Sequence, residues 1–275
     1  MAKRGKFIKP QNRRISSARV VASKKISPNF VRVTIAGDEL GSVIPMGFDQ
    51  WFRMFVPQPG QKTLRLPSSG GGLWYTHYRL MAKDVRPVVR NYTIRDFRAA
   101  GSGTFGGTTE IDIDFAAHGD LGPASAWAST TEAGDELAIL DEGRVYNPTP
   151  GAEWQLLVGD ESALPAIAGI MTSAPRDLRA EVFIEIADAE DAQDLPVGDG
   201  VNVHWLVRGD STAHPGALAL RSVMEAELPT GPSYAFVAGE SGLATSLRRH
   251  LVIDRGVPKS DIAFTGYWRH GHASF

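Results

Sequence analysis

Residues 89–95 read Val-Arg-Asn-Tyr-Thr-Ile-Arg, a run rich in β-branched and aromatic residues that is typical of a β-strand. Alternation along such a strand places Arg90 and Tyr92 on one face and Thr93 on the other. The guanidinium of Arg90 is a planar fork of donors that suits a phosphate, and the ring of Tyr92 is flat and suits contact with a flavin. Taken alone, so short a motif is more often an ordinary barrel strand with a salt-bridged arginine and a half-buried tyrosine.

A second segment follows at residues 117–128 and reads Ala-His-Gly-Asp-Leu-Gly-Pro-Ala-Ser-Ala-Trp-Ala. Gly122 and Pro123 favour a tight turn that opens a helix, in which the backbone N–H groups near Ala124 and Ser125 are free to bind an anion. His118 is a further candidate for contact with a flavin or its adenine, although a lone histidine is more often structural. A cation, a flat ring and a phosphate cradle in this order suit a flavin nucleotide, so the two segments together favour that interpretation over an ordinary strand.

The first half of the chain is predicted to form an antiparallel β-barrel. Short runs that alternate apolar with polar residues are separated by Gly, Pro and Asp turns, a pattern typical of such barrels. The predicted strands are residues 15–23, 30–36, 51–56, 88–96, 110–117 and 136–140. Residues 63–83 interrupt the pattern with three consecutive glycines and several aromatic residues, and we expect a long surface loop there.

Strands and helices alternate in the second half, beyond a Pro- and Gly-containing linker at residues 146–151. The predicted strands are residues 153–158, 180–187, 201–207, 234–238 and 262–267, and the predicted helices are residues 163–172, 216–228 and 243–255. This alternation predicts a parallel sheet with helices on both faces. The expected organisation is a basic, flexible tail at residues 1–14, a barrel domain at 15–147 and an α/β domain at 148–275.

Composition limits the possible functions. The 275 residues are 43% apolar and 22% charged, as in a globular protein, and no apolar run approaches the roughly 20 residues of a membrane helix. The absence of cysteine excludes disulfides, Cys-ligated zinc and iron–sulfur clusters held by cysteine, and fits a cytoplasmic protein. A formal net charge of −2 argues against nucleic acid as the main partner. The hydrolase, metalloprotease and P-loop motifs are all missing.

Polar and aromatic residues gather where the predicted parallel strands end. Asp160 and Ser162 follow the first of these strands, Gly239 and Glu240 follow the fourth, and Trp268 follows the fifth. Ligands of open parallel sheets bind at the carboxyl ends of the strands, so this edge is a candidate nucleotide site. The G-x-G-x-x-G fingerprint is absent, however, and Asp160 and Ser162 are equally explained as helix caps.

These motifs resemble those of the siderophore-interacting protein family, which are FAD-dependent ferric-siderophore reductases within the ferredoxin-reductase-like superfamily. The resemblance spans nearly the whole chain. It depends on five segments in family order, namely residues 90–93, 118–128, 159–167, 238–240 and 266–269. It implies an FAD-binding antiparallel barrel followed by a parallel-sheet NAD(P)H-binding domain, and reduction of iron(III) in a siderophore so that iron(II) is released.

The resemblance also implies which residues hold each ligand. For FAD they are Arg90, Tyr92, Thr93, Asp114, Phe115, His118, Gly122, Ala124, Ser125, Asp160, Ser162 and Trp268. For the nicotinamide nucleotide they are Gly239, Glu240 and Arg248, and for the siderophore Arg53, Arg144 and Arg269. Asp141 and Glu142 stand where the family commonly has a Pro-Arg-Gly-like turn, and they add negative charge beside these cations. No catalytic side chain and no metal ligand is expected, because the flavin carries the redox chemistry.

Three points stay open at the level of the sequence. The electron donor is NADH, NADPH or a ferredoxin: Asp188, Glu190 and Asp191 disfavour a 2′-phosphate, whereas Arg248 and Arg249 would accept one. The alternatives to a ferric-siderophore reductase are a siderophore-binding protein without redox activity and a general flavin or ferredoxin-type reductase. A monomer is expected, and the siderophore is not identified.

Overall fold

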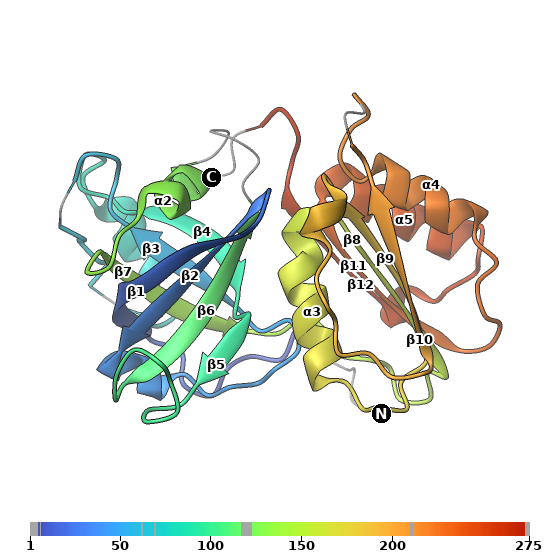
Figure 1. Ribbon diagram of the computed structural model, residues 1–275, viewed down its shortest axis with the longest axis horizontal. Helices are drawn as coiled ribbons and strands as arrows, with labels where there is room; N and C mark the ends of the chain where they lie inside the picture. Colours follow the sequence, from blue (N-terminus) through green and yellow to red (C-terminus); the bar gives the residue numbers. More distant parts are fainter. Residues whose placement is uncertain are drawn as a thin grey trace. The chain divides into compact units, whose positions relative to one another are not determined.

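Figure 1 shows a computed structural model of the chain, which describes residues 5, 7–61, 63–68, 70–116, 123–209 and 212–272. The chain divides into two compact units, Lys9–Arg144 and Val145–Ser274, and Gly5, Phe7 and Ile8 group with the second unit. Within the part of the chain that the structure describes, every helix is too short or too polar to span a membrane.

The first unit is a seven-stranded antiparallel sheet. Its strands are β1 (Ile15–Ser27), β2 (Phe30–Gly37), β3 (Trp51–Val56), β4 (Val88–Thr93), β5 (Asp96–Arg98), β6 (Thr109–Ala116) and β7 (Glu136–Gly143). They lie in the order β4-β3-β7-β1-β2-β6-β5, and a short 3₁₀ helix, η1 (Asp38–Ser42), follows β2. Each of these pairings is antiparallel.

The sheet closes into a barrel because its two edge strands are consecutive in the chain. β4 lies at one edge and β5 at the other, yet only Ile94 and Arg95 separate them. The backbone N–H of Ile94 donates to the carbonyl of Gln50 next to β3, and that of Arg95 donates to the carbonyl of Asp112 in β6. The link between β4 and β5 is therefore hydrogen-bonded to both sides of the seam.

Alternate residues of the strands fill the interior of the barrel. Ile111, Ile113 and Phe115 of β6 point inward and are fully buried. The helix α2 (Pro123–Thr130) covers this core through Ala128, which is buried, and Trp127, whose ring centroid lies 5.9 Å from that of Phe115. The core of the first unit thus includes a helix that begins within the second segment singled out in the sequence, residues 117–128.

The prediction of a long loop at residues 63–83 is wrong in the second half of that range, where the structure has the helix α1 (Trp74–Leu80). Trp74 and Tyr78 lie four residues apart and so share one helix face. Trp74 is buried, and its ring meets that of Phe55 edge-on with centroids 5.7 Å apart. The helix forms because it covers a second apolar cluster on the outer face of β3 and β7, which includes Phe55, Ala138 and Leu140.

The second unit is a five-stranded parallel sheet with helices. Its strands are β8 (Trp154–Gly159), β9 (Ala180–Ile186), β10 (Val201–Val207), β11 (Ser233–Glu240) and β12 (Ile262–Trp268). Its helices are α3 (Leu164–Ser173), α4 (Ala217–Glu225) and α5 (Ser241–Ile253), with short 3₁₀ helices η2 (Glu161–Ala163), η3 (Ala189–Asp191) and η4 (Lys259–Asp261). The strand order β10-β9-β8-β11-β12 reverses at β8, which is the position where open α/β sheets bind ligands.

The helices of this unit lie on both faces of the sheet (Figure 1). Leu156 and Val158 of β8 pack in one cluster with residues of α4 and α5, whereas Gly159 faces α3. A Cβ at Gly159 would lie 2.5 Å from that of Ala163 and 3.2 Å from Cδ1 of Ile167. Glycine is therefore required here for the close approach of α3 to the strand.

The predicted fold class is confirmed: an antiparallel barrel precedes a parallel sheet covered by helices. One predicted strand, residues 88–96, is in fact two, because the chain crosses the barrel seam after Thr93. Residues 1–14 were expected to form a flexible tail, but two of the described residues there make contacts with the rest of the first unit. Asn12 donates to the carbonyl of Ser42 at 3.3 Å, and Arg13 pairs with Glu142 at 2.7 Å.

Candidate functional site

Arg90 and Tyr92 of β4 provide the centre of the candidate flavin site. Nη1 of Arg90 donates to the carbonyl of Val89 at 2.7 Å, and no carboxylate pairs with this guanidinium among the residues that the structure describes. The ring of Tyr92 lies 4.3 Å from that of Phe115, centroid to centroid. Burial raises the pKa of Tyr92 and the charge of Arg90 lowers it, with burial dominant, so the phenol stays neutral. Thr93 is buried on the opposite face of the strand.

These side chains fit a flavin dinucleotide. Partial burial of an arginine without a counterion costs free energy, and a bound anion offsets this cost. A pyrophosphate is an anion whose oxygens match the planar fork of the guanidinium. The neighbouring tyrosine offers an aromatic surface. Ser125 lies in the first turn of α2, and its Oγ is 3.4 Å from the carbonyl of Ala116. His118 and Gly122 lie outside the described residues, as does the side chain of Ala124, so their assignment to FAD stays a prediction.

Asp114 and Phe115 have their side chains engaged within the first unit. Phe115 is fully buried in the barrel core. The carboxylate of Asp114 accepts from Nε of Arg32 at 2.6 Å and from Nη2 at 2.8 Å, and Nε of Arg95 lies 3.5 Å away. Their predicted role in binding FAD remains untested, and the structure gives both residues a structural role.

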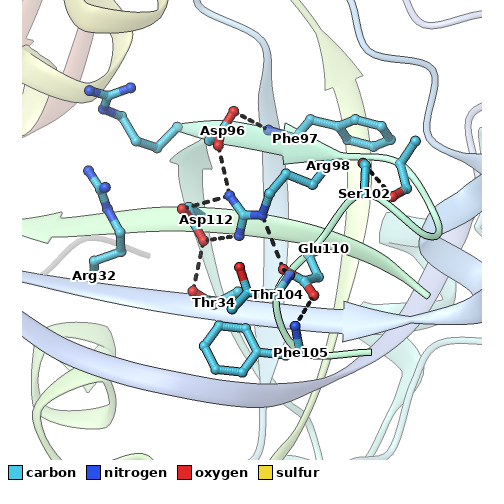
Figure 2. Close-up of polar contacts among 12 residues, drawn as sticks. Arg32, Thr34, Asp96, Phe97, Arg98, Ser102, Thr104, Phe105, Glu110 and Asp112 are labelled. Atoms are coloured by element: carbon cyan, nitrogen blue, oxygen red, sulfur yellow. Dashed lines mark hydrogen bonds and ion pairs between the residues drawn. The ribbon is translucent and has the colours of Figure 1, made fainter. Parts of the chain in front are cut away.

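Asp114 is one of three acids in a row on the outer face of β6, the others being Glu110 and Asp112. All three are buried. Figure 2 shows how Arg98 of β5 reaches across to this row: it donates to Asp112 at 2.7 and 3.0 Å and to Glu110 at 3.1 Å. Burial raises the pKa of Asp112, but the hydrogen bonds from Arg98 and Thr34 outweigh it and lower the pKa. Each carboxylate of the row is therefore paired with an arginine on the outer face of the barrel.

Arg53, predicted to bind a siderophore, lies on β3 among aromatic rings. Its Nε is 2.6 Å from Oε1 of Glu142, and its guanidinium lies 5.0 Å from the ring centroid of Trp74 and 5.4 Å from that of Trp51. Arg13 pairs with the same carboxylate at 2.7 Å. Two cations, Arg13 and Arg53, therefore share one glutamate. Their combined positive charge exceeds the single negative charge of Glu142.

Asp141, the second acid expected to disturb this region, is 2% exposed. It accepts hydrogen bonds from the backbone N–H of Gly143 at 2.9 Å and from Nε2 of Gln50 at 3.0 Å. Burial is the main cause that raises its pKa. Asp141 therefore closes a turn and presents little negative charge to solvent.

The other two arginines predicted for the siderophore have different environments. The guanidinium of Arg144 lies 4.3 Å from the ring centroid of Phe48, and its Nε is buried without a hydrogen-bond partner among the residues that the structure describes. Arg269 is exposed just after β12, where its backbone bridges to His272. Arg53 and Arg144 belong to the first unit and Arg269 to the second.

Asp160 holds together the carboxyl ends of three strands in the second unit. It is fully buried. Its Oδ1 accepts from the backbone N–H of Ser162 at 2.9 Å and from Oγ of Ser162 at 2.5 Å, while Oδ2 accepts from the backbone N–H of Glu240 at 2.6 Å and from Nε1 of Trp268 at 3.0 Å. Burial, followed by the charge of Glu161, raises the pKa of Asp160 to about 7.

Gly239 and Glu240 complete this edge. Gly239 has φ +127°, and a Cβ there would lie 2.7 Å from the carboxylate of Asp160. Glu240 caps α5 by accepting from the backbone N–H groups of Gly242 and Leu243, and Oε1 accepts from the backbone N–H of His270 at 3.2 Å. The structure thus brings together Asp160 with Ser162, Gly239, Glu240 and Trp268, and it shows that Asp160 and Glu240 act as helix caps.

Arg248 is not part of this group. It lies about 10 Å further along α5, seven residues beyond Ser241, given a rise of about 1.5 Å per residue. Its guanidinium stacks 4.6 Å from the ring centroid of Phe264 in β12. Its assignment to the nicotinamide nucleotide remains a prediction that the geometry of α5 does not favour.

A buried ion-pair cluster, which was not predicted from the sequence, lies at the same edge. Arg208, which follows β10, lies 2.6 Å from Glu161 and 2.7 Å from Glu185, and both glutamate side chains are fully buried. Glu185 also accepts from the backbone N–H groups of Gly216 and Ala219 at the start of α4. The available signal was an acid within the apolar run of β9, since a charge in such a run needs a partner.

Two family models match this chain, one in each half of the sequence. Residues 19–145 match the family model of the siderophore-interacting FAD-binding domain, and residues 152–271 match that of the siderophore-interacting protein. Over 260 residues the chain is 31% identical to the ferric vibriobactin reductase ViuB of Vibrio cholerae, which covers 91% of this chain and 88% of that protein.

Two solved structures are similar over nearly the whole chain. The siderophore-interacting protein SipS from Aeromonas hydrophila has a TM-score of 0.76 at 32% identity, covering 94% of this chain and 93% of its own. A siderophore utilization protein from T. fusca has a TM-score of 0.78 at 29% identity, covering 97% of both chains.

Proposed function

This chain belongs to the siderophore-interacting protein family, and we propose that it is an FAD-containing oxidoreductase that reduces siderophore-bound iron(III). The product is iron(II), which hard oxygen chelators hold less tightly than iron(III), so reduction releases the metal. One hydride donor balances two iron centres: the nicotinamide loses a hydride, two iron(III) ions gain one electron each, and one proton is released.

The observation that supports FAD as the cofactor is the pairing of Arg90 with Tyr92. Arg90 is half-buried and lacks a carboxylate partner in the described residues, beside a ring that packs on the barrel core. In this proposal Arg90 binds the pyrophosphate, Tyr92 lies along the flavin ring and the first turn of α2 receives the phosphates through its backbone N–H groups. FAD supplies the conversion between a two-electron donor and a one-electron acceptor.

Arg53, Arg144 and Arg269 are the proposed contacts with the siderophore. Arg53 and Arg13 share Glu142, and Asp141 is buried, so the acids of this turn do not cancel the cations around Arg53. A ferric chelate that carries net negative charge is therefore the favoured substrate class. NAD(P)H is the proposed donor at the edge formed by Gly239 and Glu240, with a ferredoxin as the alternative. A cytoplasmic monomer completes the proposal.

The test is to purify the protein and follow its flavin absorbance without oxygen. The protein should be yellow, NADH or NADPH should bleach it, and a ferric siderophore should restore the colour while a ferrous-specific dye traps iron(II). Bleaching that ferric chelates never reverse would instead indicate a general flavin reductase. A colourless protein that still binds ferric chelate would indicate a binding protein without redox activity.

Two variants connect the activity to the candidate site. Arg90→Ala and Tyr92→Ala should each lose most of the bound FAD, because each removes a direct contact. Arg65→Ala is the matched control, since Arg65 is an exposed arginine of the first unit outside its strands. FAD content that is equal in all three variants would rule out the assignment of Arg90 and Tyr92.

A further inference from the structure

We propose that the electron-donor site of the second unit selects NADH against NADPH, because Arg208 is withheld from the nucleotide by Glu161 and Glu185 while Asp188 faces it. The inference rests on the proposed function, in which a nicotinamide nucleotide binds at the carboxyl ends of the parallel strands. It concerns the 2′ position of the adenosine ribose, where NADPH carries a phosphate and NADH a hydroxyl.

Arg208 is the one lysine or arginine in the connection from β10 to α4, residues 208–216. Its fork is fully occupied: Nη2 donates to Oε1 of Glu161 at 2.6 Å, and Nη1 donates to Oε1 of Glu185 at 2.7 Å and to Oε2 of Glu161 at 3.2 Å. The side chain is only 11% exposed. Two buried carboxylates outnumber this single cation, so a phosphate that approached Arg208 would find its charge already neutralised.

Asp188 lies at the carboxyl end of β9, next to β10 in the sheet. It is exposed, and a capping box fixes its position: Oδ1 accepts from the backbone N–H of Glu190 at 2.8 Å, and its own backbone N–H donates to Asp191 at 3.2 Å. In doubly wound folds an acid that follows the second strand accepts a hydrogen bond from the ribose 2′-hydroxyl, whereas an arginine there accommodates a 2′-phosphate.

The charge around Asp188 supports the same selection. Residues 187–200, which connect β9 to β10, contain five acidic residues and no lysine or arginine. Arg248 stacks on Phe264 two turns into α5, and Arg249 follows it, so neither lies at the strand ends. A 2′-phosphate at the ends of β9 and β10 would therefore meet like charge and, in the described part of these two connections, no free lysine or arginine, whereas a hydroxyl would find an acceptor.

The test compares binding and does not depend on iron reduction. Isothermal titration calorimetry with NAD⁺ and NADP⁺ should give at least about tenfold tighter binding of NAD⁺, as expected for a dianion placed beside a connection that carries acids and no lysine or arginine. Flavin reduction in a stopped-flow instrument should show the same order for NADH and NADPH. Equal affinity, or tighter binding of NADP⁺, would overturn the inference.

Two variants test the residues. Asp188→Asn should raise the affinity for NADP⁺ by about three- to tenfold and weaken NAD⁺ slightly, while Asp194→Asn, an exposed acid of the same connection, should change neither. Glu161→Gln should shift the ratio further toward NADP⁺ by freeing one side of Arg208. If Asp188→Asn leaves the affinities for NAD⁺ and NADP⁺ as unchanged as Asp194→Asn does, the proposal is wrong. This result holds even if Glu161→Gln fails to fold.

The outcomes also separate this inference from the proposed function. If neither nucleotide binds, the inference is wrong, because no nucleotide site lies at this edge. Photoreduced protein mixed with ferric siderophore then still reports on iron reduction by itself, since that reaction needs no nucleotide.

Discussion

The indole Nε1 of Trp268 donates a hydrogen bond of 3.0 Å to Oδ2 of Asp160, although 108 residues separate the two in the chain. The same oxygen accepts from the backbone N–H of Glu240 at 2.6 Å. One carboxylate therefore fixes the ends of β8, β11 and β12 relative to one another. The sheet edge proposed to bind nucleotides is therefore held in place by Asp160, whose side chain is fully buried.

Asp160 should make the stability of the protein depend on pH. Its pKa in the folded state is raised to about 7, against about 3.9 for an unperturbed aspartate, so the folded state binds more protons between these values. The free energy of unfolding should therefore fall as pH rises from about 4 to about 7, by up to about 4 kcal/mol from this group. Urea unfolding at several pH values measures it. Asp160→Asn should show a flatter profile over this window, and an identical profile would contradict the assignment.

Replacing Arg90 by lysine tests whether the fork geometry matters beyond the charge. Lysine keeps the cation but loses the planar pair of donors, so we expect the Kd for FAD to rise about tenfold, which corresponds to about 1.4 kcal/mol. Titration of FAD into apoprotein, followed by flavin fluorescence, gives the Kd. Arg65→Lys serves as the control, and an unchanged Kd in Arg90→Lys would show that only charge is used.

The row of acids on β6 should make Arg98 a major contributor to stability. Arg98→Met leaves Asp112 and Glu110 buried without their main counterion, which should lower the free energy of unfolding by about 3–5 kcal/mol. The matched control is Arg19→Met, because Arg19 pairs with Glu136 on the surface with 61% of its side chain exposed, and its loss should cost less than about 1 kcal/mol. Urea denaturation distinguishes the two, and equal losses would refute the role given to the buried row.

Glu142 should moderate the affinity for anionic ligands. In Glu142→Gln the positive charges of Arg53 and Arg13 lose their shared counterion, so we expect a ferric chelate of net negative charge to bind about three- to tenfold more tightly, with a steeper dependence on salt. Quenching of protein fluorescence by the chelate measures it, and Glu136→Gln is the control. Weaker binding would mean that Glu142 instead orients Arg53 for contact.

Structural features that follow from local sequence patterns were predicted correctly. Features that depend on contacts between residues far apart in the chain were missed. Alternation placed Arg90 and Tyr92 together, and cap chemistry anticipated the role of Asp160. The helix α1 was missed because it is seven residues long and follows a glycine run, and it forms through burial of Trp74 against Phe55. The Arg208 cluster joins residues up to 47 positions apart, and no spacing rule gives such a pairing.

The division of the chain into two units also divides its charge. Residues 9–144 carry 17 Lys and Arg against 14 Asp and Glu, a balance of +3, whereas the whole chain has −2 and the remainder therefore −5. A ligand of negative charge is thus attracted by the barrel unit and repelled by the rest of the protein. Its association should be guided toward the first unit over distances of about a Debye length, and should slow as ionic strength increases.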